Sequence, residues 1–192
     1  MQINIDATTI LRPFRPADRD DLVAGINDWA VARWLARVPY PYRQDHADEF
    51  LGRNEHRDIE SAMSNLESEF AFALCRHDRA IGGLVANPAD GEGRREIGFW
   101  LARPFWGRQV MRRAVAAMMH EMLRVAPHTR IVASANHDNL RSQGLIQALG
   151  FVADGQREVF STPLQRPVLL HCFRHPGDWG IPHRPPPIEK PP

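Results

Sequence analysis

The stretch best suited to chemistry runs from Arg95 to Met119, where we predict a strand, a Trp-Gly turn and then a helix. The first turn of this helix is basic and contains Arg108 and Arg112. The free backbone N–H groups and the positive dipole end of a helix N-terminus bind phosphate groups. The segment therefore predicts a site for a phosphate-bearing cofactor that lies against a sheet.

The same turn departs from the usual pattern of a phosphate-binding loop. Gln109 and Met111 stand where small residues are typical. A small residue lets the backbone approach a phosphate closely. Two interpretations follow: the larger residues present their N–H groups in the ordinary way, or they crowd the cofactor.

Length and composition predict one domain with a real core. The chain has 192 residues, of which 43% are apolar and 24% charged, as in ordinary globular proteins. Its formal net charge of +1 gives no overall field that favours nucleic acid or membrane as a partner. Cys75 and Cys172 lie in predicted strands among apolar neighbours, and we expect free buried thiols.

We find no pattern typical of a targeting segment, a membrane span or a metal site in this sequence. The first residues, MQINIDATTI, lack the basic and apolar regions of a signal peptide, and no apolar run approaches the ~18 residues of a membrane span. We expect a cytoplasmic protein. The histidines are scattered without zinc-site spacing, and we expect no metal.

The hydrophobic patterns predict alternating strands and helices. The predicted strands span 8–13, 69–76, 80–87, 95–101, 130–134, 151–160 and 167–173. Helices are predicted over 16–26, 30–35, 45–63 and 140–149, with one more carrying an apolar stripe from Met111 to Met122. This order favours an α/β fold of the α+β sandwich type, with helices packed on a mixed sheet. Proline is dense from His175 onward, which predicts an extended tail over 175–192 after one domain at 1–174.

Three segments together resemble the GNAT acyltransferase superfamily, and more narrowly its Rim-type branch of ribosomal-protein N-terminal acetyltransferases. They are ILRPFRPADRDDLVAGINDWAVARWLARVPYPY from Ile10, EIGFWLARPFWGRQVMRRA from Glu96 and NHDNLRSQGLIQALGF from Asn136. The resemblance implies a mixed, mostly antiparallel sheet of about seven strands flanked by about four helices. It also implies acetyl transfer from acetyl-CoA to an amine by direct attack in a ternary complex.

The resemblance assigns the cofactor contacts residue by residue. The strand carrying the cofactor motif splays from its neighbour, and pantetheine bonds to its end at Phe99, Trp100 and Leu101. The pyrophosphate lies on the N–H groups of the loop and first helical turn. These residues are Gly107, Arg108, Gln109, Val110, Met111 and Arg112. The chain carries Trp106 at the first loop position, as is usual for the Rim-type branch.

Glu96 is the candidate general base, because related enzymes often have an acidic residue on this strand near the attacking amine. An α-amine, with a pKa of about 7.7–8, is often neutral at pH 7, so a carboxylate acting directly or through a water would suffice. The alternatives are a structural ion pair of Glu96 with Arg94 or Arg95, or a solvated position on the sheet.

Ser142 and Asn139 belong to the Asn-x-x-Ser motif of the third segment. Many superfamily members have a tyrosine four residues after this serine, but here Ile146 stands there, so Ser142 is the candidate acid for the leaving thiolate. The alternative is an ordinary first-turn helix serine. Asn139 is a candidate contact of the pantetheine arm, or an N-cap of the following helix.

Residues before the first hairpin lie where the family forms its acceptor cleft. Tyr42 is a candidate acceptor contact, whereas Trp34 fits core packing. His137, close to the expected thioester position, is a candidate second acid or base.

Two functions from different classes remain open. One is an N-acetyltransferase whose partners are acetyl-CoA and an amine acceptor, with no nucleic acid or membrane, acting as a monomer or homodimer. The other is a non-catalytic CoA-sensing or protein-interaction module on the same fold, which Gln109, Met111 and the missing tyrosine would favour.

Overall fold

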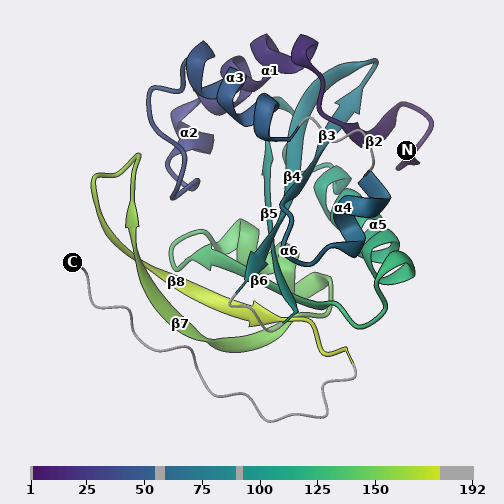
Figure 1. Cartoon of the computed structure of the whole chain (residues 1–192). Helices are drawn as coiled ribbons and strands as arrows, with labels where there is room; N and C mark the ends of the chain where they lie inside the picture. The colour runs from purple at the N-terminus through teal and green to yellow at the C-terminus, as the bar shows by residue number, and fades with distance from the viewer. Residues whose placement is uncertain (1, 55–58, 90–92, 178–192) are drawn as a thin grey trace.

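One open sheet of eight strands runs through the protein, whose computed structural model describes residues 2–54, 59–89 and 93–177. Across the sheet the strand order is β1, β2, β3, β4, β5, β6, β8 and β7 (Figure 1). The strands are β1 Ile3–Asn4, β2 Thr9–Pro13, β3 Phe70–Arg76, β4 Arg79–Ala89, β5 Arg94–Leu101, β6 Arg130–Asn136, β7 Val152–Ser161 and β8 Arg166–Arg174. The helices are η1 Pro16–Asp18, α1 Arg19–Ile26, α2 Trp29–Ala32, α3 Gln44–Arg53, α4 Ile59–Ser64, η2 Arg103–Phe105, α5 Val110–Val125 and α6 Leu140–Ala148.

Strands β5 and β6 form the parallel pair of this otherwise antiparallel sheet. Their pairing ends at Ile97 opposite Ala133. Strand β5 continues to Leu101, still paired with β4, and β6 continues to Asn136, paired with β8. The two strands therefore separate beyond Ile97, and this edge of β5 has no strand partner among the described residues.

Strand β3 is buried on both sides, because helices cover both faces of the sheet here. Phe70, Phe72 and Leu74 belong to the core cluster on the side of α4 and α5, whereas Ala71 and Ala73 pack on the side of α1 and α3. Figure 1 shows these two groups of helices on opposite sides of the sheet. A strand covered on both faces reads as a continuous apolar run, as this one does.

Helix α5 presents one apolar face to the core. Ala114, Val115, Met118 and Met122 are each no more than 1% exposed. Their spacing of three to four residues confirms the predicted stripe, because it gathers these side chains on one face. Burial of this face fixes the rotation of α5 about its axis.

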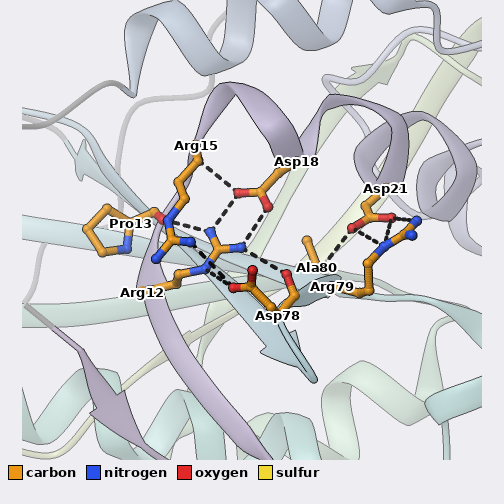
Figure 2. A network of polar contacts seen from close by, with 8 residues as sticks. All are labelled: Arg12, Pro13, Arg15, Asp18, Asp21, Asp78, Arg79 and Ala80. Atoms are coloured by element: carbon orange, nitrogen blue, oxygen red, sulfur yellow. Dashed lines mark hydrogen bonds and ion pairs between the residues drawn. The ribbon is translucent and has the colours of Figure 1, made fainter.

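A buried ion pair attaches the start of the first helix to the sheet (Figure 2). The side chains of Arg12 on β2 and Asp18 in η1 are both 3% exposed and are joined by hydrogen bonds of 2.7 and 2.8 Å. Asp18 also accepts the backbone N–H of Arg15, and Arg12 donates to the carbonyl oxygen of Asp78 in the β3–β4 turn. The forked geometry offsets the cost of burying both charges.

The predicted fold class is confirmed, with corrected element counts. The described residues hold eight strands rather than about seven, because the two-residue β1 carries no readable pattern. They hold six α-helices rather than about four, partly because the helix predicted over 45–63 is two helices, Gln44–Arg53 and Ile59–Ser64. Residues 55–58 lie outside the described part of the chain.

The helix predicted over 30–35 ends at Ala32. Both cysteines are free, but Cys75 is buried whereas Cys172 is half-buried. Most of the predicted proline-rich tail, residues 178–192, lies outside the described residues, so the domain boundary at 174 stays a prediction.

Candidate cofactor-binding and catalytic site

A cavity of about 650 Å³ lies where β5 and β6 separate. Its walls are the end of β5, the turn before α5, the first turn of α5, the start of α6 and the region of α2. The sequence-predicted site residues that line it are Phe99, Trp100, Leu101, Gly107, Arg108, Gln109, Val110, Met111, Arg112, Asn139 and Ser142. Glu96 and Tyr42 are not among the lining residues.

The N-terminus of α5 opens onto this cavity without a side-chain cap. Its first backbone hydrogen bond joins the N–H of Arg113 to the carbonyl oxygen of Gln109 at 3.2 Å. The helical N–H groups before Arg113 therefore have no acceptor within the helix. Arg108 and Arg112 line the cavity beside them. An uncapped helix start with two guanidinium groups is suited to bind a phosphate group.

The two unusual residues at the start of α5, Gln109 and Met111, are accommodated in different ways. Gln109 adopts the left-handed conformation, with a φ of 59°, that normally favours glycine, and Gly107 also has a positive φ of 76°. Met111 is 5% exposed and packs in the core cluster under α5. Little of its side chain is therefore available to crowd a ligand.

The start of α6 carries the Asn-x-x-Ser motif. The side-chain oxygen of Asn139 accepts the backbone N–H of Ser142 at 3.2 Å, which is the N-cap arrangement. Both residues line the cavity. Of the two helix N-termini at this cavity, α6 is thus capped by its own side chain and α5 is not.

Arg141 is a further cation at the cavity that was not predicted from the sequence. The guanidinium carbon of Arg141 lies 4.9 Å from the centroid of the Trp106 ring, and both residues line the cavity. The Trp106 indole N–H donates to the carbonyl oxygen of Leu101 at 2.7 Å, which fixes the ring. The basic residue in the first turn of α6 was a readable signal, since the same reasoning identified Arg108 just before α5 and Arg112 in its first turn.

The opposite wall of the cavity comes from the region of α2. Val31, Trp34 and Leu35 line it. Trp34 is half-buried and its ring lies 4.4 Å from the guanidinium carbon of Arg33. The prediction of core packing for Trp34 is therefore incomplete, because its side chain also faces the cavity.

Glu96 forms a polar cluster with residues from two other strands and a loop. Its Oε1 accepts hydrogen bonds from the Ser134 hydroxyl at 2.5 Å and from Nη2 of Arg157 at 2.6 Å. Its Oε2 lies 3.9 Å from Nη2 of Arg37. The Glu96 side chain is 18% exposed, so solvent still reaches it.

The ion-pair partners of Glu96 differ from those considered in the sequence analysis. Arg95 points to the other face of β5 and is fully buried. Its guanidinium donates to carbonyl oxygens at the end of α4, including those of Ala62 and Asn65 at 2.9 and 2.6 Å. Arg157 could not be identified from the sequence, because it follows Glu96 by 61 residues and no local pattern links the two.

Tyr42 lies in the second core cluster and is 6% exposed. Its hydroxyl donates to the carbonyl oxygen of His46 at 3.2 Å. Burial raises the pKa of this hydroxyl to about 12. In this arrangement the side chain has almost no surface to offer to an acceptor, contrary to the role expected from the sequence.

His137 is exposed and is not among the residues that line the cavity. Its Nε2 lies 2.9 Å from Oδ1 of Asp138, and its ring centroid is 5.9 Å from that of His171. This environment gives no support to His137 as a second acid or base.

The fold and the cavity agree with a family-level match. The family model described as an acetyltransferase (GNAT) domain matches residues 8–152. The chain therefore belongs to the GNAT acetyltransferase family and is an acyltransferase. A comparison with curated protein sequences gives no match.

Among the described residues, no helix is both long enough and apolar enough to span a membrane.

Solved structures with the same fold include Rim-type enzymes. RimL, a ribosomal L7/L12 α-N-protein acetyltransferase in complex with coenzyme A, is 17% identical with a TM-score of 0.71, covering 91% of this chain and 98% of that one. The ribosomal-protein-S5-alanine acetyltransferase from Vibrio fischeri is 19% identical with a TM-score of 0.72, covering 94% and 100%. The microcin C7 self-immunity acetyltransferase MccE, in complex with acetyl-CoA and AMP, is 14% identical with a TM-score of 0.71, covering 88% and 93%.

Proposed function

We propose that this protein is an N-acetyltransferase that moves an acetyl group from acetyl-CoA to a primary amine, on a protein N-terminus or a small molecule, by direct attack in a ternary complex. The observation that carries the proposal is the cavity between the separated strands β5 and β6, which ends at the uncapped N-terminus of α5. The similar structures of RimL and MccE, which hold coenzyme A and acetyl-CoA, support the choice of cofactor.

The residues present fit acetyl-CoA. The unpaired edge of β5 at Phe99, Trp100 and Leu101 offers backbone groups to the amide-bearing pantetheine arm. The free N–H groups of the first turn of α5 offer donors to the pyrophosphate, with guanidinium groups beside them. These guanidinium groups belong to Arg108, Arg112 and Arg141.

Bound acetyl-CoA supplies the acetyl group as a thioester, so that a carbon–nitrogen bond to the amine forms as the carbon–sulfur bond breaks. Glu96 Oε2 is the atom assigned to take the proton that the amine loses, directly or through a water. It is suited to this because the two hydrogen bonds of Glu96 engage Oε1 alone. An α-amine with a pKa of about 7.7–8 needs only such modest assistance near pH 7.

Ser142 is the group assigned to the leaving sulfur. Its backbone N–H is held by Asn139, which fixes the residue at the cavity wall. The pKa of a free thiol is about 8.5, so the thiolate needs little help to leave. Ser142 therefore contributes a hydrogen bond in this proposal, and the transfer does not depend on it absolutely.

Acetyl-CoA-dependent turnover tests the proposal. The protein is incubated with acetyl-CoA and a panel of peptides with free N-termini and small amines, and free thiol and acetylated amine are both measured. We expect thiol release that requires an amine and matches acetylated product, with an Nα-blocked peptide as the inactive control. Bound acetyl-CoA with no thiol release across the panel would favour the non-catalytic CoA-sensing or protein-interaction module instead.

A further inference from the structure

We propose that the acceptor carries a carboxylate close to its reacting amine, and that Arg37 binds this carboxylate. The acceptor class is therefore an α-amino acid or a peptide that begins with an acidic residue. This inference rests on the proposed acetyl transfer and specifies its second substrate. Its basis is the arrangement of charged groups around Glu96.

Two guanidinium groups surround one carboxylate at this point. Arg157 donates to Oε1 of Glu96 at 2.6 Å and also to the Ser134 hydroxyl at 3.2 Å, so its charge is compensated within the cluster. Arg37 lies 3.9 Å from Oε2 of Glu96 and is 75% exposed. Within the described part of the chain, this ion pair is the only polar contact of the Arg37 side chain. The cluster therefore carries one positive charge more than negative charge, and that charge faces solvent.

The carboxylate of Asp154, which like Glu96 and Arg157 lies close enough to Cys172 to affect it, does not cancel this charge. It pairs with Arg174, whose Nε lies 3.5 Å from Oδ1 of Asp154. The positive charge of Arg37 is thus left for a ligand.

The backbone beside Arg37 is held in place by the edge of the sheet. The carbonyl oxygen of Ala36 accepts the backbone N–H of Thr162, in the turn between β7 and β8, at 2.8 Å. Figure 1 shows this hairpin reaching toward α2. One hydrogen bond therefore joins the loop that carries Arg37 to the hairpin that carries Arg157, so both arginines are positioned around Glu96.

Arg37 and Glu96 do not line the cavity themselves, but both neighbour lining residues along the chain. Arg37 follows Leu35, a lining residue, by two positions, and Glu96 precedes the lining residue Phe99 by three. Because Arg37 lies 3.9 Å from Oε2 of Glu96, a ligand that places its amine at Glu96 has its neighbouring groups within reach of Arg37. A guanidinium group binds a carboxylate with two parallel hydrogen bonds, which favours this anion over a neutral or cationic group.

Matched acceptors test the proposal with the full chain. The peptides Asp-Ala-Ala-amide and Asn-Ala-Ala-amide differ only in the charge beside the α-amine. Lys-Ala-Ala-amide reverses this charge, and acetylation of its side-chain amine is counted separately from that of its α-amine. Alanine compared with alaninamide tests an α-carboxylate as the anionic group. We expect kcat/KM for the acidic peptide or for alanine to exceed that of its neutral partner by about tenfold, the effect of one charged hydrogen bond. Arg37→Gln removes this preference and Arg37→Glu shifts it toward the lysine peptide.

Arg43→Gln is the matched control, because Arg43 ends the same loop, pairs with Asp45 and is not a partner of Glu96. Equal kcat/KM for the acidic, neutral and basic acceptors would overturn the inference, as would a preference for the acidic acceptor that survives Arg37→Gln. Neither result would contradict the proposed acetyl transfer itself. If no amine is acetylated, a binding measurement tests the carboxylate site independently of acetyl transfer. Calorimetry then gives the affinities of the acidic and lysine peptides for the protein saturated with CoA. Tighter binding of the acidic peptide that depends on Arg37 supports the carboxylate site, and equal binding overturns it.

Discussion

The side chains of Glu96 and Arg157 are joined by a hydrogen bond of 2.6 Å, although β6 and β8 separate their strands in the sheet. The contact ties the edge hairpin to the strand at which the cavity opens. Because Arg157 and Ser134 both bind Oε1, the Oε2 atom of Glu96 makes no hydrogen bond among the described residues. One carboxylate thus has one oxygen held by two hydrogen bonds, and a second that faces Arg37 at 3.9 Å without a hydrogen bond and is available to accept a proton.

Substitution of this carboxylate tests the general-base proposal. Glu96→Gln keeps the size of the side chain but removes its basicity, so we expect kcat/KM for the amine to fall by about 100-fold. The dissociation constant for acetyl-CoA should not change, because Glu96 does not line the cavity. Steady-state thiol release and calorimetry measure the two quantities.

Glu158→Gln is the control for that variant, since Glu158 is exposed on β7 and has no contact with Glu96. It should retain the original rate. A Glu96→Gln protein as active as the unaltered one would remove Glu96 from the mechanism.

The central fold was predictable because its signals are local. The apolar run from Phe70 and the helical stripe from Met111 to Met122 each identify an element from adjacent residues. The end of α3 at Arg53 could not be predicted in the same way. The residues of α3 and of α4 are both typical of polar helices, so their composition reads as one helix over 45–63. The N-terminal pair Ile3–Asn4 is too short to show alternation and forms a strand only by pairing with β2.

The left-handed residue before α5 should limit stability. An amino acid with a side chain is disfavoured at the φ of 59° that Gln109 adopts, and glycine is not. We expect Gln109→Gly to raise the free energy of unfolding by about 0.5–1 kcal/mol, measured by denaturant titration. The same change at the exposed helical Gln147 should lower it. A destabilised Gln109→Gly protein would show that the side chain makes a stabilising contact.

The buried guanidinium of Arg95 should be a major source of stability. It is fully buried, lies 4.9 Å from the Phe70 ring and donates to several backbone carbonyl oxygens around the end of α4. Arg95→Met leaves those oxygens without a donor, so we expect a loss of about 3 kcal/mol in the free energy of unfolding. The exposed ion pair of Arg124 should contribute far less, and Arg124→Met is the control. Equal losses in both variants would contradict this assignment.

Tyr42 should make stability depend on pH in the alkaline range. Burial raises its pKa from 10.0 to about 12 in the folded protein. The unfolded chain ionises first, so this contribution is fully present below pH 10 and is lost as pH rises from 10 to 12. Tyr42→Phe should show a smaller loss over this window in denaturation experiments.

Activity of the same variant separates a structural from a binding role. The Tyr42 hydroxyl is already bound to the His46 carbonyl oxygen within the core cluster. Tyr42→Phe should therefore leave kcat/KM for the amine unchanged at pH 7.5, with Tyr40→Phe as the control. A raised KM for the amine in Tyr42→Phe alone would restore Tyr42 as an acceptor contact.

The candidate site was predictable where chemistry follows from position along one helix or strand. The N-terminus of α5 and the capping motif at Asn139 are of this kind. The partners of Glu96 could not be predicted from the sequence. Ser134, Arg157 and Arg37 come from separate elements that meet only in the folded protein. The conformation of Gln109 was also hidden, since glutamine carries no signal for a positive φ.

Calorimetric titration with acetyl-CoA, with desulfo-CoA as the control, tests the central claim most directly. The uncapped α5 N-terminus and the lining residues Arg108, Arg112 and Arg141 predict micromolar binding. The combined Gln109→Gly and Met111→Ala variant should bind with similar affinity, because Met111 is packed in the core. Absence of binding at millimolar acetyl-CoA would contradict the account, and recovery of binding in the double variant would identify the loop as the cause.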